Sequence, residues 1–176
     1  MIIVQINICF VHSFLYISLA AFNIEYKHKM KLRHPSTIVV SGPTGCGKTE
    51  LVLKLLEQRR LAPFPQRLIW VFGEWQEAYE RVRLAFPEIE FVEGYQDWIY
   101  DGLNPKVRNL LVLDDQMDSM GDKRALAKLF TQGSHHRNLT VIFIVQNVYH
   151  KGRAMRDAMV NSQYRVYFEN QADKLQ

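Results

Sequence analysis

The stretch "VVSGPTGCGKTELVLKLL" at residues 39–56 joins an apolar run to a helical pattern through a turn that contains three glycines. Residues 37–40 are typical of a short buried strand, and leucines recur at helical spacing after residue 50. Residues 42–49 match the pattern G-x-x-x-x-G-K-[ST] at every fixed position. A chance match somewhere in a chain of this length has a probability on the order of one per cent. The turn therefore predicts a phosphate-binding loop.

The residue types of this loop suit a bound triphosphate. Glycines lack Cβ, so the backbone at Gly42, Gly45 and Gly47 can curl and aim several N–H groups at one anion. The next helix presents its N-terminus, where unpaired N–H groups and the helix dipole favour phosphate. Lys48 can reach the β- and γ-phosphates, and the Thr49 hydroxyl can bind Mg²⁺. We expect nucleotide contacts from Gly42, Pro43, Thr44, Gly45, Cys46, Gly47, Lys48, Thr49 and Glu50.

The composition is that of an ordinary globular protein. With 176 residues, of which 48% are hydrophobic and 23% charged, the chain can form one domain with a sizeable core. The net charge of +4 is compatible with nucleic-acid binding but too small to demonstrate it. Cys9 and Cys46 are the only cysteines and give no disulfide framework, so we expect an intracellular, reducing compartment, the cytoplasm or nucleus.

The two ends of the chain depart from this pattern. Residues 1–24 contain no Asp, Glu, Lys or Arg, lack the basic start of a secretory signal, and have polar residues within their apolar run. Three readings stay open for residues 1–29: a gene-model artefact upstream of a start at Met30, a membrane or targeting segment, or a genuine extra element. We expect this leader to lie outside a nucleotide-binding domain at residues 30–176, for whose core no membrane is expected. The polar ending without a closing helix suggests a C-terminal truncation.

The remaining apolar runs predict a parallel sheet. They lie at residues 68–72, 110–113, 139–145 and 164–169, with a further short strand expected within residues 89–94, and helical patterns alternate with them. The helix before residue 139 is expected to stop near Gly133, and the region around Trp98 and Tyr100 has no clear pattern. Strands that are apolar on both faces indicate an α/β fold with helices on either side of the sheet. Right-handed crossovers then bring the carboxyl ends of the strands to one edge.

Two carboxylates end the most hydrophobic of these strands. Because Asp114 and Asp115 follow a buried run, a cation or solvent must receive their charge. Asp114 suits a hold on Mg²⁺ opposite Thr49, and Asp115 could orient or deprotonate an attacking water. The alternative is an acidic cap at a strand-to-helix junction. Glu74, just past another strand, is the reserve candidate for the base.

Other polar residues at strand and helix ends have weaker signals. Gln146 closes an apolar strand and could contact both the γ-phosphate and the water, or be a solvated strand end; Asn147 is a second choice. Arg137 follows a helix and could be a finger that reaches a neighbouring subunit, or a solvated helix terminus. The basic residues at 151, 153 and 156 could face DNA or form a solvated helix face.

Three segments together carry a family resemblance: "HPSTIVVSGPTGCGKT", "NLLVLDDQMD" and "GSHHRNLTVIFIVQNVYHKG". From about Met30 onward the chain resembles the FtsK–HerA superfamily of DNA-packaging ATPases, found in large double-stranded DNA viruses (poxvirus-like enzymes) and Polinton-type mobile elements. The resemblance implies a P-loop NTPase with a RecA-like (ASCE-type) parallel sheet, ATP and Mg²⁺ as cofactors, a homo-oligomeric ring, double-stranded DNA and a capsid component as partners.

The same resemblance assigns roles to individual residues. It gives Lys48 and Thr49 to nucleotide and Mg²⁺, Asp114 to Mg²⁺ and Asp115 to water activation, while Gln146 would sense hydrolysis and Arg137 would be the finger. The chain departs from the family pattern in its double Asp in place of Asp-Glu, its uncharged leader and its missing C-terminal portion.

Three other functions stay open. Short P-loop kinases for small molecules begin in the same way, but no compact arginine-rich lid is evident. "DSMG" and "NQAD" faintly resemble the specificity motifs of a GTPase switch, with Gln171 where a lysine belongs. An inactive nucleotide-binding remnant of a mobile element is the last alternative.

Overall fold

The computed structural model describes residues 2–11, 14–18, 31–116, 124–146 and 153–168. Its strands are β1 (Ile2–Val11), β2 (Phe14–Ser18), β3 (Leu32–Arg33), β4 (Thr37–Ser41), β5 (Leu61–Ala62), β6 (Arg67–Phe72), β7 (Glu90–Glu93), β8 (Asn109–Asp114), β9 (Leu139–Val145) and β10 (Tyr164–Phe168). Its helices are α1 (Lys48–Glu57), α2 (Ala78–Ala85), α3 (Asp97–Asp101), α5 (Arg124–Lys128), the π-helical η2 (Leu129–Gly133), α6 (Ser134–His136) and α7 (Arg153–Val160). No helix among these described residues is long and apolar enough to cross a bilayer.

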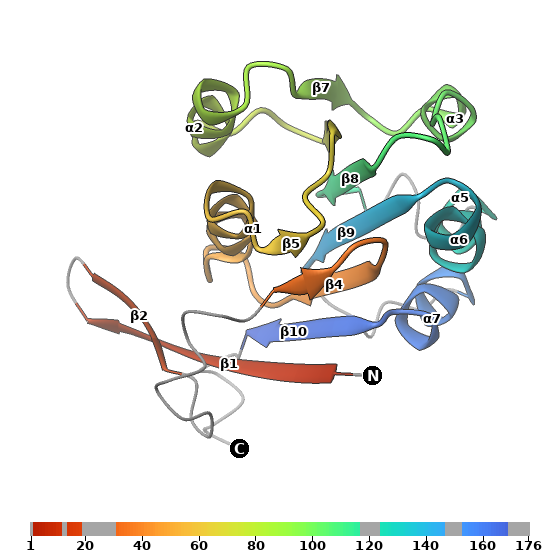
Figure 1. The fold of residues 1–176 in the computed structure, drawn as a ribbon. Coiled ribbons are helices and arrows are strands. Elements are labelled where there is room, and N and C mark those ends of the chain that lie inside the picture. The colour runs from red at the N-terminus through yellow and green to blue at the C-terminus, as the bar shows by residue number, and fades with distance from the viewer. Residues whose placement is uncertain (1, 12–13, 19–30, 117–123, 147–152, 169–176) are drawn as a thin grey trace.

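Eight of these strands form one sheet in the order β2-β1-β10-β4-β9-β8-β6-β7 (Figure 1). Every neighbouring pair runs parallel except β1 with β2. The predicted α/β fold with a mostly parallel sheet is therefore confirmed. Strand β9 lies between β4, which precedes the phosphate-binding loop, and β8, which ends in the acids. Strands β3 and β5 form a separate parallel pair.

The register of the three central strands aligns their carboxyl ends. Ser41 at the end of β4 pairs with Val145 of β9, and Asp114 at the end of β8 pairs with Ile144 of β9. Since parallel strands leave the sheet in the same direction, the loop after β4 begins at the level where the β8 acids and Gln146 emerge. The topology thus brings three separate segments of chain to one edge.

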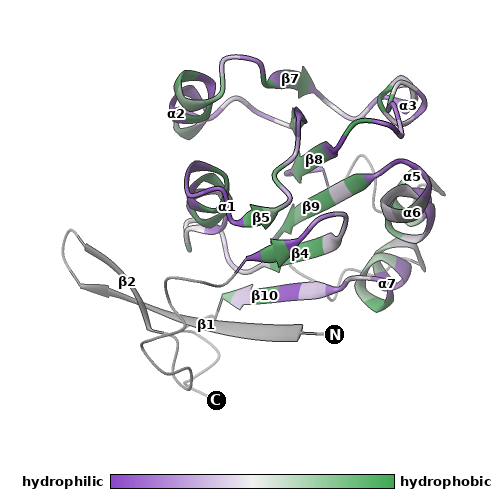
Figure 2. Ribbon diagram, viewed as in Figure 1, coloured by the Kyte–Doolittle hydropathy of each residue, from purple (hydrophilic) through white to green (hydrophobic). Residues whose placement is uncertain are grey.

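Helices cover both faces of the sheet, as the alternation of apolar side chains requires. Ile38 and Val40 of β4 belong to the core under α1 and α2, whereas Val39 belongs to the core under α3, α5, η2 and α7. All residues of β4, β8 and β9 are buried. Figure 2 shows β4 and β9 as predominantly hydrophobic strands in the middle of the molecule, with hydrophilic residues on the surrounding helices. This double-sided core makes the central strands a rigid base for their carboxyl ends.

Three expectations about elements need revision. Helical structure does not stop at Gly133 but continues through α6, because Gly133 has φ −60 and packs closely, with an added Cβ only 3.1 Å from Leu139. The region around Trp98 forms the short helix α3. In the leader, β1 pairs with β10 and with β2, which forms the sheet edge, an arrangement that the sequence pattern did not predict. The boundary of the domain at residue 30 stays a prediction.

Candidate nucleotide-binding site

The loop between β4 and α1 has the curled backbone that its glycines predict. Gly45 and Gly47 have φ +75 and +92, in the left-handed region that glycine adopts without strain. Gly42 is required for a different reason, because an added Cβ would lie 2.5 Å from Cβ of Phe168 and 2.9 Å from Sγ of Cys46. The loop therefore packs directly on the end of β10, and α1 begins at once with Lys48.

Lys48 holds the loop in this shape. Its Nζ donates to the backbone carbonyls of Gly42, at 2.8 Å, and Pro43, at 2.7 Å. The side chain is only 9% exposed, although an ammonium group is costly to bury without partners. An ammonium has three N–H donors, and the third makes only a long contact of 4.0 Å to Sγ of Cys46, so it can turn to a phosphate oxygen. Lys48 can thus shape the loop and bind the anion with the same group.

A hydrogen-bonded triad of side chains lies beneath the loop. The Thr49 hydroxyl donates to Oδ2 of Asp114 at 3.1 Å, and the Tyr79 hydroxyl donates to the same oxygen at 2.9 Å. Asp114 is 3% exposed and Tyr79 is fully buried. Each residue comes from a different element, namely α1, α2 and β8. Asp114, the last residue of β8, is therefore fixed directly against the first turn of α1.

Burial dominates the electrostatics of this triad. It raises the pKa of the Asp114 carboxyl above its ordinary value, while the hydrogen bonds from Tyr79 and Thr49 oppose the rise. Burial together with the negative charge of Asp114 raises the pKa of Tyr79, so its hydroxyl stays protonated and remains a donor. Burial also raises the pKa of the Cys46 thiol, and the nearby Lys48 ammonium opposes this rise. The buried carboxylate is the group that a cation would stabilise most.

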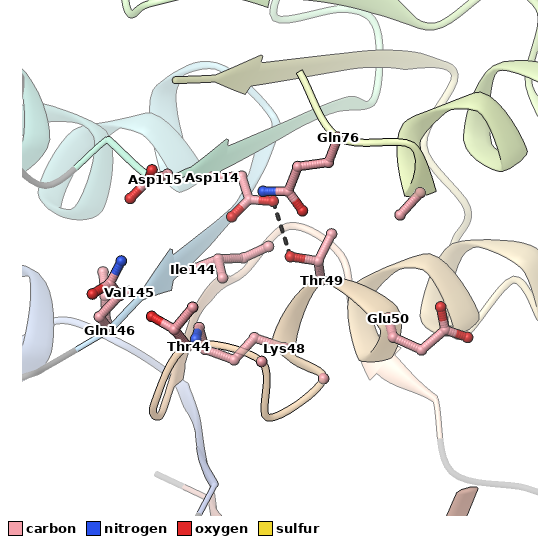
Figure 3. Close-up of a pocket in the computed structure, with 13 residues that line it drawn as sticks. Thr44, Lys48, Thr49, Glu50, Gln76, Asp114, Asp115, Ile144, Val145 and Gln146 are labelled. Atoms are coloured by element: carbon pink, nitrogen blue, oxygen red, sulfur yellow. Dashed lines mark hydrogen bonds between the residues drawn. The ribbon is translucent and has the colours of Figure 1, made fainter. Parts of the chain in front are cut away.

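A cavity of about 350 Å³ opens above these residues (Figure 3). Most of the predicted site residues line it: Thr44, Gly45, Gly47, Lys48, Thr49, Glu50, Asp114, Asp115 and Gln146. Figure 3 shows Asp115 and Gln146 on the side of the cavity away from α1, with Thr49 and Lys48 opposite them. Gly42, Pro43 and Cys46 belong to the loop without lining the cavity. The glycine-rich loop, the acids and the strand-end glutamine therefore meet around one cavity.

The outer carboxylate differs from the inner one in exposure and backbone. Asp115 is exposed and has φ +56, a conformation in which aspartate and asparagine are over-represented among non-glycine residues. The backbone reversal after Asp114 is close to β6, because an added Cβ on Gly73 would lie 3.0 Å from the Asp115 carbonyl oxygen. Gln146 is likewise exposed at the end of β9. Both side chains can reach a ligand in the cavity, whereas Asp114 is fixed in place.

Outside the loop, three of the described candidates do not line the cavity. Arg137 precedes β9, so it sits at the opposite edge of the sheet, where it donates to the Leu103 carbonyl at 3.2 Å and lies 5.1 Å from the Tyr100 ring centroid. Glu74 is exposed and is not among the residues that line the cavity. Arg156 is exposed on α7. Asn147, Lys151, "DSMG" and "NQAD" fall outside the described residues, as does the side chain of Arg153.

The structure adds residues that the sequence pattern did not single out. Gln76 lines the cavity beside Asp114 and Thr49, from the segment between β6 and α2 (Figure 3). Tyr79 supplies the second hydrogen bond to Asp114. Glu50 lines the cavity but also pairs with Arg81 at 2.8 Å, which joins α1 to α2. In the sequence, only the polar character of Gln76 and its position two residues after Glu74 could have indicated a role at the site.

The donor set fits magnesium. The Thr49 hydroxyl and the Asp114 carboxylate are hard oxygen ligands of the kind Mg²⁺ takes when substrate phosphates and waters complete its shell. Within the described part of the chain, no group of three or more His, Cys, Asp or Glu side chains forms an all-protein metal site. Phosphates and waters would supply the other ligands of a cation held by Thr49 and Asp114.

Comparison with known proteins bears on the fold. Neither protein-family models nor curated proteins give a match. Among solved structures, the cytoplasmic domain of EssC has a TM-score of 0.53 at 18% identity, over 80% of this chain and 32% of that one. The genome-packaging NTPase B204 of Sulfolobus turreted icosahedral virus 2, in complex with AMP, has a TM-score of 0.51 at 13% identity, over 80% of this chain and 78% of B204. The fold is that of a P-loop NTPase.

A second structure of B204, in complex with ATP-γ-S, matches with a TM-score of 0.50 at 13% identity over the same shares of the two chains. The predicted P-loop NTPase fold is thus confirmed. The P-loop NTPase chain described here spans about a third of the EssC chain that it matches.

Proposed function

We propose that this P-loop NTPase binds and hydrolyses ATP with Mg²⁺ and is the motor domain of a translocase that pumps double-stranded DNA. The observation that carries the proposal is the Thr49–Asp114 hydrogen bond, which joins the phosphate-binding loop to the acidic strand end across 65 residues of sequence. This contact places the two side chains that would hold the cation at the foot of the cavity that Lys48 and Gln146 also line. A genome-packaging NTPase with the same fold supports the motor assignment.

Each group at the cavity has a chemical task in hydrolysis. The backbone N–H groups of residues 42–47 and the Lys48 ammonium bind the phosphate oxygens and withdraw charge from the γ-phosphate. Thr49 and Asp114 would hold Mg²⁺, which supplies further charge neutralisation when bound. Electrostatic stabilisation of this kind is the main catalytic contribution that a protein makes to phosphoryl transfer.

The attacking water needs a base and an orienting group. The exposed Asp115 carboxylate accepts a hydrogen bond from the water and takes its proton as the water attacks phosphorus. The Gln146 amide can bind the water and a γ-phosphate oxygen together, because it has both donors and an acceptor. Gln146 directly follows β9, which pairs with β4 on one side and with β8 on the other. Strand pairing therefore sets the distance of Gln146 from the phosphate-binding loop and from the acids.

Arg137 fits this scheme only as a residue that acts between subunits. It lies at the edge of the sheet opposite the cavity, so it cannot reach a γ-phosphate bound to its own chain. In a homo-oligomeric ring this edge of one subunit would face the nucleotide of the next, and the guanidinium would stabilise the transition state there. The ring, duplex DNA, a capsid component and an intracellular location all form part of the proposal.

The decisive experiment for the motor proposal measures ATP hydrolysis by the purified chain with Mg²⁺, with and without duplex DNA. We expect ADP release that increases at least several-fold with DNA and that ATP supports at least tenfold better than GTP. Hydrolysis that responds to a small phosphate acceptor and not to DNA would favour a kinase. A tenfold preference for GTP would favour the GTPase switch, and no turnover under any condition would favour an inactive remnant.

The ring proposal has its own test in mixed subunits. Arg137→Ala leaves the cavity intact and should bind ATP without hydrolysing it. Lys48→Ala removes the phosphate contact but keeps the arginine. If Arg137 acts between subunits, mixtures of the two inactive variants should hydrolyse ATP at a measurable fraction of the wild-type rate. The absence of rescue at any ratio would contradict a role between subunits.

A further inference from the structure

Tyr79 contacts the Asp114 carboxylate and has no part in the mechanism above. Its hydroxyl donates to Oδ2 of Asp114 at 2.9 Å, and the Thr49 hydroxyl donates to the same oxygen at 3.1 Å. The two hydrogen bonds hold Oδ2 in place, so the Asp114 carboxylate cannot rotate about its Cβ–Cγ bond. The direction of Oδ1 is then fixed as well.

The ring of Tyr79 is itself fixed by an aromatic cluster. Its centroid lies 5.2 Å from that of Trp70, 5.5 Å from Trp75, 5.8 Å from Phe72 and 5.9 Å from Phe91, in tilted, edge-on and stacked contacts. Tyr79 is fully buried in this cluster. Because a tyrosine hydroxyl is rigidly attached to its ring, these contacts determine where the donor sits.

We infer that Tyr79 is a positioning residue for the metal site, whose hydroxyl holds Asp114 through Oδ2 and leaves Oδ1 free to hold the cation. The inference rests on the proposed function, since it assumes that a metal–nucleotide complex binds at this cavity. Residues that hydrogen-bond to a metal's ligands commonly contribute 10–100-fold to metal affinity, although they never touch the metal. Tyr79 would contribute in this way whether or not Thr49 turns its oxygen towards the cation.

The test uses Tyr79→Phe, which keeps the ring in its cluster and removes only the hydroxyl. The matched control is Tyr164→Phe, which removes a phenol that accepts a hydrogen bond from the Arg33 backbone N–H at the opposite edge of the sheet. Mn²⁺ affinity is measured on the full chain saturated with ATP-γ-S, and ATP-γ-S affinity is measured separately in EDTA. We expect Tyr79→Phe to weaken Mn²⁺ binding about tenfold and to leave metal-free nucleotide binding within about twofold. Tyr164→Phe should change neither affinity.

The outcomes separate this inference from the proposed function. If the wild-type chain binds Mn²⁺ and ATP-γ-S, and Tyr79→Phe binds Mn²⁺ equally well, the positioning role is wrong while the nucleotide site stands. An equal loss of affinity with and without metal would also overturn it, because a purely structural defect would act in that way. If the wild-type chain binds no ATP-γ-S, both proposals fail.

A second measurement needs neither nucleotide nor metal and applies even if Tyr79→Phe is less stable. The free energy of unfolding is compared for Tyr79→Phe in the wild-type chain and in an Asp114→Ala background. We expect removal of the hydroxyl to destabilise the first protein and to leave the second unchanged or more stable, because the hydroxyl there has lost its acceptor. Equal effects in the two backgrounds would show that the hydroxyl does not act through Asp114.

Discussion

Thr49 and Asp114 share a 3.1 Å hydrogen bond, although Thr49 lies in the first turn of the helix after the phosphate-binding loop and Asp114 ends a strand 65 residues later. Asp114 is almost fully buried, so the contact is not a chance encounter of surface side chains. It depends on the order of strands β4, β9 and β8, which brings the two ends to one edge. The candidate site is therefore a property of the tertiary fold, and changes at its separate parts should have separable effects.

Lys48→Ala should abolish ATP binding. The substitution removes the charge at the phosphates and also the two hydrogen bonds to the Gly42 and Pro43 carbonyls that hold the loop curled. We expect a loss of affinity of at least about 100-fold, since hydrogen bonds to charged groups contribute about 1.5–3 kcal/mol each. Titration with a fluorescent ATP analogue measures the change. Lys54→Ala, on the same helix but in a half-exposed pair with Glu50, should stay within about twofold of the wild type.

Asp115→Asn should keep nucleotide binding and lose turnover by about 100-fold or more, the contribution typical of a general base. Asparagine adopts φ +56 as readily as aspartate, so the loop backbone is not disturbed by this change. Single-turnover hydrolysis and equilibrium binding are measured on the same preparation. A variant that hydrolyses ATP at the wild-type rate would exclude Asp115 as the base and direct attention to Glu74, despite its position outside the cavity lining.

Asp114→Asn should unfold at a higher denaturant concentration than the wild type at pH 8. Burial raises the pKa of Asp114 in the folded chain above its ordinary value of 3.8. At a pH between the unfolded-state pKa and the higher folded-state pKa of Asp114, the folded chain binds more protons than the unfolded chain. The free energy of unfolding therefore falls as pH rises through this range. The difference between variant and wild type should therefore shrink as pH falls towards 4. If Asp114→Asn is less stable than the wild type at pH 8, the hydrogen bonds from Thr49 and Tyr79 already offset the cost of burying the carboxylate, which contradicts the prediction.

Alkylation of Cys46 should be slow at neutral pH, should accelerate as pH rises, and should be blocked by ATP. Burial raises the pKa of the thiol, and the thiolate is the reactive form, so reaction requires a pH above the ordinary range. Cys46 does not line the cavity, but its Sγ lies 4.0 Å from Nζ of Lys48, so a nucleotide held by residues 42–49 should restrict access to the thiol. Mass spectrometry of the modified peptide gives the rate, and Cys46→Ser identifies the signal. Equal rates with and without saturating ATP would contradict a nucleotide bound at this loop.

Local sequence patterns predicted the elements that position the site. The glycines and Lys48 form the loop because their spacing encodes the backbone conformation directly, and buried strands such as β8 and β9 are readable from unbroken apolar runs. The convergence of Asp114 and Gln146 on the loop followed from parallel strands alone. These inferences succeeded because they depend on residues that are close in sequence and on one topological rule.

Tyr79 and Gly133 show where such patterns fail. Tyr79 reads as an apolar residue on the buried face of α2, together with Val82, and its hydroxyl partner lies 35 residues away. Gly133 has the residue type of a helix end, but it is buried against Leu139, so tertiary packing and not a turn selects glycine. In each case the decisive contact comes from another element, which local propensity does not encode.

A crystal structure of the chain with ATP-γ-S and Mg²⁺ tests the central claim most directly. We expect the triphosphate within the loop at residues 42–49, Lys48 against the β- and γ-phosphates, Mg²⁺ beside Thr49 and Asp114, and Gln146 within hydrogen-bond distance of the γ-phosphate. A nucleotide bound elsewhere, or a triphosphate in the loop with Asp114 and Gln146 both turned away from it, would contradict the assignment of this edge of the sheet as a site of ATP hydrolysis.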